Sequence, residues 1–139
     1  ARPAGKGRLQ VVVVSPEATV LETGADFVAL PLLDGEMGIA PLHSPLIGRL
    51  GYGELRIVDG AQTSRYYIDG GFVQVANDVV SVLTSRATPA AAIDPKAAAE
   101  QLQAAKNRPA TTTETLAARE KAQLQARALL RVAERGGAK

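Results

Sequence analysis

The distribution of glycine and alanine divides this chain into two parts. Of the 13 glycines among the 139 residues, eleven fall at or before Gly71, and none lies between Phe72 and Arg135. Alanine then supplies 16 of the last 51 residues. Because glycine suits turns and alanine favours helices, the sequence predicts a turn-rich domain over 9–88 and a helical domain over 89–139, after a flexible tail at 1–8.

The first part has the residue pattern of an all-β domain, in which turn residues separate short apolar runs. Runs rich in Val, Ile, Leu and Tyr are separated by turn residues at intervals of roughly 8–12, which is typical of a sandwich or barrel. The turn signals are Ser15-Pro16-Glu17, Asp34-Gly35, Gly51-Tyr52-Gly53, Asp59-Gly60, Asp69-Gly70-Gly71 and Asn77-Asp78. We expect a β-sandwich of about ten short strands, with its clearest hairpin at Asp59-Gly60. The alternation over 79–84 predicts a central strand with both faces buried.

The second part carries the start and stop signals of two helices. Asp94 is a good N-cap and Pro95 suits the first helical position, so a short helix is predicted over 96–108, where Pro109 stops it. The run Thr111-Thr112-Thr113-Glu114 reads as a capping box, and the second helix should reach about Arg135, with Gly136 ending it. These signals predict an antiparallel two-helix hairpin.

Small side chains predict close packing of this hairpin. On the first helix the packing residues are expected to be Ala97, Ala98, Ala104 and Ala105. On the second they are expected to be Ala117, Leu124, Ala128, Leu129 and Val132. Alanine buries little area but lets two helices approach closely, so we expect a hairpin of marginal stability when it is undocked, as suits a switchable element.

Composition excludes several classes of function. The net charge of +2 combines −2 over 1–88 with +4 over 89–139, without a Lys/Arg block or interleaved aromatics, so a nucleic-acid partner is not expected. The chain has no cysteine, which excludes disulfides and thiolate metal sites. Its apolar runs fall far short of the ~18 residues of a membrane span, so we expect a soluble protein.

A search for catalytic chemistry finds none. The single histidine, His43, has no Cys, Asp or Glu nearby at metal-ligand spacing, and the nucleophile-elbow, zincin, phosphate-loop and dinucleotide motifs are missing. Asp34 and Glu36 flank Gly35 and are interpreted as a solvated hairpin tip rather than an acid/base pair. We therefore expect no enzyme activity, no metal and no cofactor in the isolated chain.

One segment carries a resemblance to a known family. The run Asp34-Gly35-Glu36-Met37-Gly38-Ile39-Ala40-Pro41-Leu42-His43-Ser44-Pro45-Leu46 resembles the signature loop of the epsilon subunit of the F-type ATP synthase. The runs 51–57, 70–75 and 77–83 look like the family's next strand and its closing hairpin, and the likeness extends over about 9–135.

The chain departs from that family at two positions. Where the family usually has Pro-Gly-His, this sequence has Pro41-Leu42-His43, and leucine resists a positive φ. At the start of the first helix, Ala97 stands where some members carry an arginine associated with ATP binding. Without that guanidinium, Asp94 is left as a weak nucleotide-binding candidate and tight ATP binding is not expected.

The resemblance implies a rotor subunit of the central stalk, with no turnover of its own. Its partners would be the gamma subunit, the c-ring and, through the helices, the alpha/beta catalytic head. It would sit peripherally on the cytoplasmic face of the bacterial plasma membrane, or the equivalent organelle face, held there by the complex. The implied c-ring contacts are Asp34, Gly35, Glu36, Met37, Leu42, His43 and Ser44.

The helices imply a second role. In the family they fold against the sandwich or extend into the catalytic head and inhibit ATP hydrolysis. The residues implied for such an inhibitory tail are Arg119, Lys121, Arg127, Arg131 and Arg135. Two alternatives stay open at this point: a primarily nucleotide-sensing inhibitor, and a free-standing β-sandwich that binds a ligand. The sequence does not distinguish proton from sodium coupling.

Overall fold

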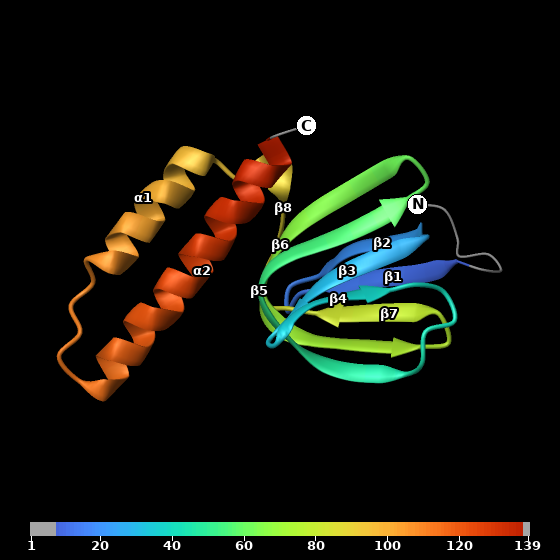
Figure 1. The fold of residues 1–139 in the computed structure, drawn as a ribbon, viewed down its shortest axis with the longest axis horizontal. Coiled ribbons are helices and arrows are strands. Elements are labelled where there is room, and N and C mark those ends of the chain that lie inside the picture. Colours follow the sequence, from blue (N-terminus) through green and yellow to red (C-terminus); the bar gives the residue numbers. More distant parts are fainter. Residues whose placement is uncertain (1–7, 138–139) are drawn as a thin grey trace.

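The computed structural model describes residues 8–137 (Figure 1). The strands are β1 (Leu9–Val14), β2 (Thr19–Ala25), β3 (Phe27–Leu32), β4 (Gly35–Ile39), β5 (Leu46–Asp59), β6 (Gln62–Ala76), β7 (Val79–Leu83) and β8 (Ala87–Pro89). A 3-10 turn, η1 (Ala90–Ala92), leads to the helices α1 (Pro95–Lys106) and α2 (Thr113–Gly137). Of the tail expected at 1–8, residues 1–7 lie outside the described part, whereas Arg8 is paired with Asp26 at 2.8 Å and with Asp59 at 2.9 Å.

The strands form one sheet that folds over into a two-layered sandwich. Their order is β2-β1-β7-β6-β5-β3-β4, with β8 paired to β6, and only β1 and β7 are parallel among these pairs. The long strands β5 and β6 pass through both layers, as their curvature in Figure 1 shows. The β1–β7 layer comprises β2, β1, β7 and the adjoining parts 71–76 and 46–50; the β3–β4 layer comprises β4, β3, β8 and the parts 52–59 and 62–69.

The two long strands explain why the expected number of strands was too high. The described chain has eight strands rather than about ten. The glycines near 51–53 and 69–71 had been interpreted as turns between strands, but they lie within β5 and β6, where the sheet bends. The β-sandwich followed by a helical hairpin is confirmed, and so is the tight hairpin at Asp59-Gly60, with Gly60 at φ 62°.

Gly71 is the position that makes the bend in β6 feasible. Its φ is 113° and that of Gly70 is 74°, both in the region that favours glycine. A Cβ on Gly71 would lie 1.9 Å from the carbonyl oxygen of Leu83, on the neighbouring strand β7. The close approach of these two backbones therefore requires glycine at this position.

Alternating valines, isoleucines and leucines supply the core between the layers. The core is formed by Leu9, Val11, Val13, Ala25, Val28, Leu30, Ile39, Leu50, Leu55, Ile57, Ile68, Val73, Val75, Val80 and Val82. The strand β7 lies between β1 and β6, so its predicted central position is correct. The prediction that both its faces are buried is wrong: Val80 and Val82 face the core, whereas Leu83 is 52% exposed on the outer face.

The caps of the helices follow the sequence signals in part. Asp94 caps α1 as predicted, accepting a hydrogen bond from the Lys96 amide at 3.0 Å, with Pro95 in the first turn. The cap of α2 is Thr112 rather than Thr111: its hydroxyl accepts from the Thr115 amide at 3.1 Å, and the Thr115 hydroxyl accepts from the Thr112 amide at 2.9 Å. This is a reciprocal capping box in which threonine takes the place of the expected glutamate.

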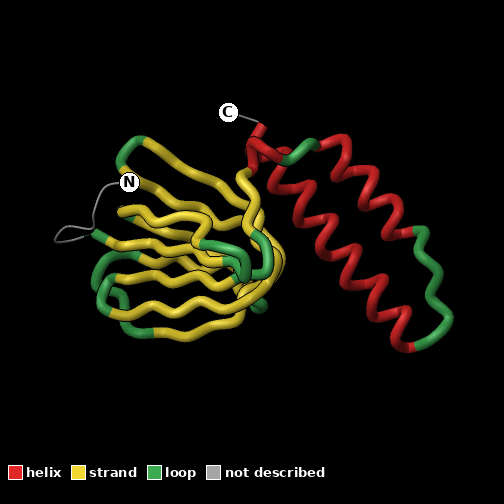
Figure 2. Tube along the Cα trace, turned by 180° about the vertical axis from the view of Figure 1, so that it is seen from behind, coloured by secondary structure: helices red, strands yellow, loops and turns green. Residues whose placement is uncertain are grey.

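Four of the residues predicted to pack between the helices are exposed instead. On α1, Ala98 and Ala105 are buried as expected, but Ala97 and Ala104 are exposed. On α2, Ala128, Leu129 and Val132 are buried, whereas Ala117 and Leu124 are exposed. The helix also continues through Gly136 to Gly137 instead of ending at Gly136. The two helices lie side by side as an antiparallel hairpin, with α2 between α1 and the sandwich (Figures 1 and 2).

Candidate functional site: the joint between the helices and the sandwich

The outer face of the β3–β4 layer carries a ladder of polar and aromatic side chains, and α2 covers part of it. In the register of β5 and β6, Tyr52 is opposite Asp69 and Glu54 is opposite Tyr67. We call the joint the set formed by these four residues together with Gln125, Ala128, Leu129, Val132 and Arg135 of α2. The α2 members recur at helical spacing, so they share one face of the helix.

Tyr67 is the centre of the joint. Its side chain is only 2% exposed and packs in a second apolar cluster with Ala98 of α1 and with Ala128, Leu129 and Val132 of α2. This cluster is separate from the core between the layers. The hairpin is therefore attached to the sandwich by its own small apolar contact.

Asp69 supplies the polar part of this contact. One of its carboxylate oxygens, Oδ1, accepts a hydrogen bond from the Tyr67 hydroxyl at 3.1 Å and another from Gln125 Nε2 at 2.8 Å. The guanidinium of Arg86 lies 5.4 Å from the centroid of the Tyr67 ring, within cation–π range. Burial raises the pKa of Tyr67 well above its usual range, and the charge and hydrogen bond of Asp69 reinforce that rise.

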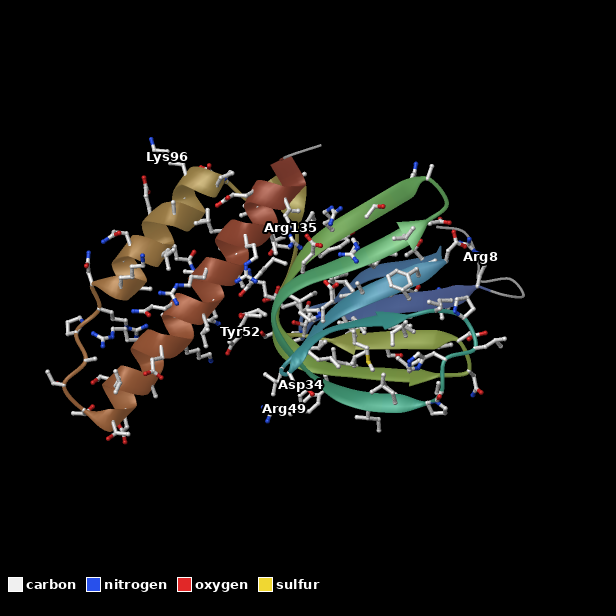
Figure 3. The ribbon with its side chains drawn as sticks, in the orientation of Figure 1. Arg8, Asp34, Arg49, Tyr52, Lys96 and Arg135 are labelled. Atoms are coloured by element: carbon white, nitrogen blue, oxygen red, sulfur yellow. The ribbon has the colours of Figure 1, made fainter. Side chains whose placement is uncertain are left out.

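A second polar contact lies at Glu54, next to Tyr67. The Glu54 side chain is 5% exposed, and its Oε1 lies 2.8 Å from Arg65, 3.4 Å from Arg56 and 3.7 Å from Arg135 near the end of α2. The other oxygen, Oε2, has no hydrogen-bond partner among the described residues. Figure 3 shows Arg135 on the side of α2 that faces the sandwich. A buried carboxylate thus collects three guanidinium groups, one of which comes from the helix.

A cleft of about 260 Å³ lies beside Glu54. Its walls are Pro31, Leu32, Gly35, Glu36, Tyr52, Gly53, Glu54, Arg131, Val132 and Arg135. The cleft mixes both charges, and Glu36 on its rim lies 3.7 Å from Arg56. Its volume is slightly below the ~300 Å³ at which small-molecule sites begin, so the geometry favours water over an organic ligand.

The residues expected to contact the c-ring fall at two ends of one strand. Asp34, Gly35 and Glu36 are exposed at the start of β4, near α2, whereas the loop with Leu42, His43 and Ser44 follows its far end. A strand of 5 residues at ~3.3 Å each places the two groups about 15 Å apart or more. Met37 lies between them, partly buried against the core.

Leu42 has an unusual conformation for its residue type. Its φ is 68°, and its side chain is 87% exposed. The loop is tied to the β6–β7 turn by a hydrogen bond of 2.6 Å from the Leu42 amide to Asp78 Oδ1. His43 Nδ1 lies 2.7 Å from the carbonyl oxygen of Ser44, in a local contact. Leucine therefore keeps the positive φ that a glycine would adopt more easily at this position.

The other predicted site residues lie on the helices. Lys121, Arg127, Arg131 and Arg135 are exposed on α2, and Arg119 is half-buried. Asp94 is occupied in capping α1, and Ala97 is exposed beside it. Figure 3 shows Lys96 pointing away from the sandwich.

Over residues 8–137, no group of His, Cys, Asp and Glu side chains is arranged to hold a metal ion. Within the same range, no helix combines the length and the apolar character needed to cross a membrane.

The sequence reasoning missed the joint. Glu54, Tyr67, Asp69 and Gln125 were not singled out, because each belongs to a pattern that also occurs on a solvated surface. One signal could have found two of them: counting back from the Asp59-Gly60 hairpin places Glu54 opposite Tyr67. Directly opposed cross-strand residues interact, so this count brings Glu54 and Tyr67 together on one face of the sheet.

Taken together, the fold and the joint define a two-part structural protein, a β-sandwich with a docked helical hairpin. Comparisons with known proteins agree. A family model described as the β-sandwich domain of the ATP synthase delta/epsilon chain matches residues 8–90. The ATP synthase epsilon chain of Rhodopirellula baltica is 46% identical over 123 residues, covering 88% of this chain and 96% of that protein. The epsilon chain of Acidithiobacillus ferridurans is 40% identical over 108 residues, covering 78% and 77%.

Solved structures show the same fold. A chain of the Euglena gracilis mitochondrial ATP synthase, in a structure of OSCP, F1 and c-ring, matches with a TM-score of 0.82 at 22% identity, covering 93% of this chain and 83% of that one. A chain from the central stalk and c-ring of the Tetrahymena thermophila enzyme matches with a TM-score of 0.70 at 14% identity, covering 94% and 99%. The chain belongs to the family of ATP synthase epsilon chains, and it is a subunit of that complex.

Proposed function

We propose that the sandwich couples rotation by binding the gamma subunit through the outer face of its β1–β7 layer. The observation that carries this proposal is the apolar character of that face: Ile47 is 77% exposed, Phe72 54% and Leu83 52%. The register places Phe72 opposite Leu83, and Leu83 opposite Val14. Exposed apolar side chains rimmed by polar ones, here by Arg49 opposite Phe72 and Gln74 opposite Ile47, are typical of interfaces between proteins.

Substitution on this face tests the contact. Phe72→Asp places a charge at the centre of the patch and should weaken binding to a catalytic head that contains gamma by at least about tenfold. Thr63→Asp is the matched control, because Thr63 is exposed on β6 beside the Asp59-Gly60 hairpin, in the other layer. Equal affinity of the Phe72 variant and the native chain would contradict the assignment.

The c-ring contact is assigned to the start of β4. Asp34, Gly35, Glu36 and the adjoining Met37 form one region, and its exposed acidic turn suits the polar loops of a ring. The loop with Leu42, His43 and Ser44 lies at the other end of β4 and leads directly into Leu46 and Ile47 of β5. An exposed leucine suits an apolar partner better than polar loops, so this second region extends the gamma-binding face.

Cross-linking separates the two regions. The chain has no cysteine, so a single introduced thiol reports one position at a time. In the assembled enzyme, Glu36→Cys should cross-link to the ring and Leu42→Cys to gamma. Cross-linking of both positions to the same subunit would refute the division.

The helices act as a brake on ATP hydrolysis. The support is the basic series Arg119, Lys121, Arg127, Arg131 and Arg135, carried by a hairpin whose attachment to the sandwich is small. The positively charged groups of these four arginines and one lysine can pair with acidic segments of the alpha/beta head. A chain ending at Pro89 keeps β8 and should bind the head but leave its ATPase rate uninhibited, whereas the full chain should slow it. Equal rates with both forms would refute the brake.

The remaining features fit this model. Nucleotide sensing would rest on Asp94, which caps α1, so calorimetric titration with ATP should show no tight binding. Membrane association is peripheral and passes through the complex, on the cytoplasmic face of the plasma membrane or its organelle equivalent. Membership of the epsilon-chain family argues against a free-standing ligand-binding sandwich.

A further inference from the structure

The docked face of α2 has a polar contact at each end and apolar contacts between them. Gln125 donates to Asp69, and Arg135 pairs with Glu54. At ~1.5 Å per residue these two side chains lie about 15 Å apart along the helix. Between them, Leu129 and Val132 pack with Tyr67.

The contact at Asp69 is specific in its geometry. A single carboxylate oxygen of Asp69 accepts hydrogen bonds from both Tyr67 and Gln125. The bond from Tyr67, within the sandwich, therefore fixes the orientation of the carboxylate that binds Gln125 of the helix. Hydrogen bonds to a charged acceptor are stronger than neutral ones. When α2 leaves, the acceptor and the buried Tyr67 ring both lose their cover.

The contact at Glu54 is built from charge. Arg65 and Arg56 of the sandwich both pair with this buried carboxylate. A third guanidinium, that of Arg135 on α2, lies 3.7 Å from the same oxygen. Arg135 is 55% exposed, so this pair is weaker than the one at Asp69. Arg131, one turn earlier, lines the same cleft without an ion pair among the described residues.

We propose that Glu54 and Asp69 form a latch that holds the hairpin in the docked state, and that Glu54 does so by occupying Arg135. Arg135 belongs to the basic series assigned to the catalytic head, so this regulatory step rests on the proposed brake. Because α2 must leave the sandwich to reach the head, Arg135 pairs either with Glu54 or with an acidic group of the head. Docking and inhibition therefore compete for the same side chain, and the latch sets how often the brake is released.

The latch is tested first in the free, full-length chain. The substitution Ala128→Cys places a single thiol on the buried face of α2, at a position that is 2% exposed when the hairpin is docked. The chain otherwise lacks cysteine. The rate at which a thiol reagent labels this cysteine is proportional to the fraction of molecules in which the hairpin is undocked, even when that fraction is small. In this background, Gln125→Ala should raise the rate about tenfold, and Glu54→Gln about two- to fivefold. The control Gln123→Ala, on the same helix, should leave it unchanged.

An unchanged labelling rate in both latch variants would overturn the latch. Gln125→Ala introduces a better helix former on a partly buried position, so unfolding of α2 does not confuse its result. Urea unfolding of each variant identifies a Glu54 variant whose sandwich fails to fold; the Gln125 variant then decides the outcome alone.

The second experiment measures ATPase inhibition with the same variants bound to the catalytic head. Glu54→Gln should inhibit more strongly than the native chain, because Arg135 is released. Arg131→Gln should inhibit less strongly while its labelling rate stays native. Increased labelling with no change in inhibition would show that the latch exists but the brake does not, whereas weaker inhibition by Glu54→Gln would refute the competition.

Discussion

The bend in β6 provides the sharpest test of how this sandwich is built. Gly71→Ala adds one carbon atom at a φ of 113°, where L residues are strained. That atom would lie 1.9 Å from the Leu83 carbonyl oxygen and 2.8 Å from the Thr84 Cα. Both obstacles are backbone atoms, so no side-chain rotation relieves the overlap. The β6–β7 pairing at Phe72 and Leu83 must shift or break.

The expected cost follows from these contacts. Backbone strain of this kind costs about 1–3 kcal/mol, and overpacking adds about 1–3 kcal/mol more. Lost hydrogen bonds between β6 and β7 contribute about 1 kcal/mol each. We therefore expect Gly71→Ala to lower the free energy of unfolding by about 3–7 kcal/mol, a large part of the ~5–15 kcal/mol typical of a domain.

Gly60→Ala is the matched control. Gly60 also has a positive φ, 62°, but a Cβ there meets nothing within 4 Å. Its strain of about 1–2 kcal/mol is largely offset by the reduced entropy of the unfolded chain, so the net change should stay within about 1 kcal/mol. The difference between the two variants isolates the close approach of β6 to β7 from the effect of positive φ.

Urea unfolding followed by tyrosine fluorescence measures both variants. The signal is read in a Tyr52→Phe, Tyr67→Phe background, because those two tyrosines pack with the helices whereas Tyr66 packs against the core of the sandwich. With a slope of about 1–3 kcal/mol per molar urea, Gly71→Ala should lower the midpoint by at least about 1 M, and Gly60→Ala should shift it little. Equal midpoints for the two variants would refute the role assigned to Gly71.

Three further outcomes are expected. Leu42→Gly should leave the free energy of unfolding unchanged or raise it by up to about 1 kcal/mol, because glycine relieves the strain of a φ of 68°. The same substitution should weaken binding to gamma. A clear loss of stability would contradict this reasoning. Burial, reinforced by Asp69, raises the pKa of Tyr67 above the unfolded value of about 10. The free energy that Tyr67 contributes to the docked state should therefore be constant below pH 10 and decrease above it. Absorbance at 295 nm should show one tyrosine that ionises late, and Tyr67→Phe should remove that late step. Thr112→Ala should cost α2 about 1 kcal/mol and reduce ellipticity at 222 nm, whereas Thr111→Ala, which keeps the cap, should not.

Local signals in the sequence predicted the parts of the fold that local physics decides. The Asp59-Gly60 turn and the Asp94-Pro95 helix start depend on a few adjacent residues, and both are present. Gly70-Gly71 was predicted to lie in a turn, whereas its positive φ values form a bend inside β6. A turn and a bend require the same residues, and the pairing of β6 with β7 and β8 decides between them at long range.

The candidate site was harder to predict, because a covering element changes the meaning of a surface residue. On β5, Glu54 alternates with buried neighbours and reads as solvent-facing; it does face outward, but α2 lies over it. The basic residues of α2 were recognised as a series, yet the sequence did not show that Arg135 already has a partner. Contacts between segments far apart in the chain carry this information, and one sequence without an alignment does not.

The separation of the two apolar clusters implies an order of events in this protein. The core between the layers contains no helix residue, whereas the Tyr67 cluster needs both helices and the sandwich. Loss of the hairpin should therefore leave the sandwich folded, but disruption of the sandwich near Gly71 should also release the hairpin, because Asp69 lies two residues away on the same strand. This asymmetry suits the rotor function proposed above, because the sandwich would keep its structure when the helices, held by the smaller Tyr67 cluster, undock.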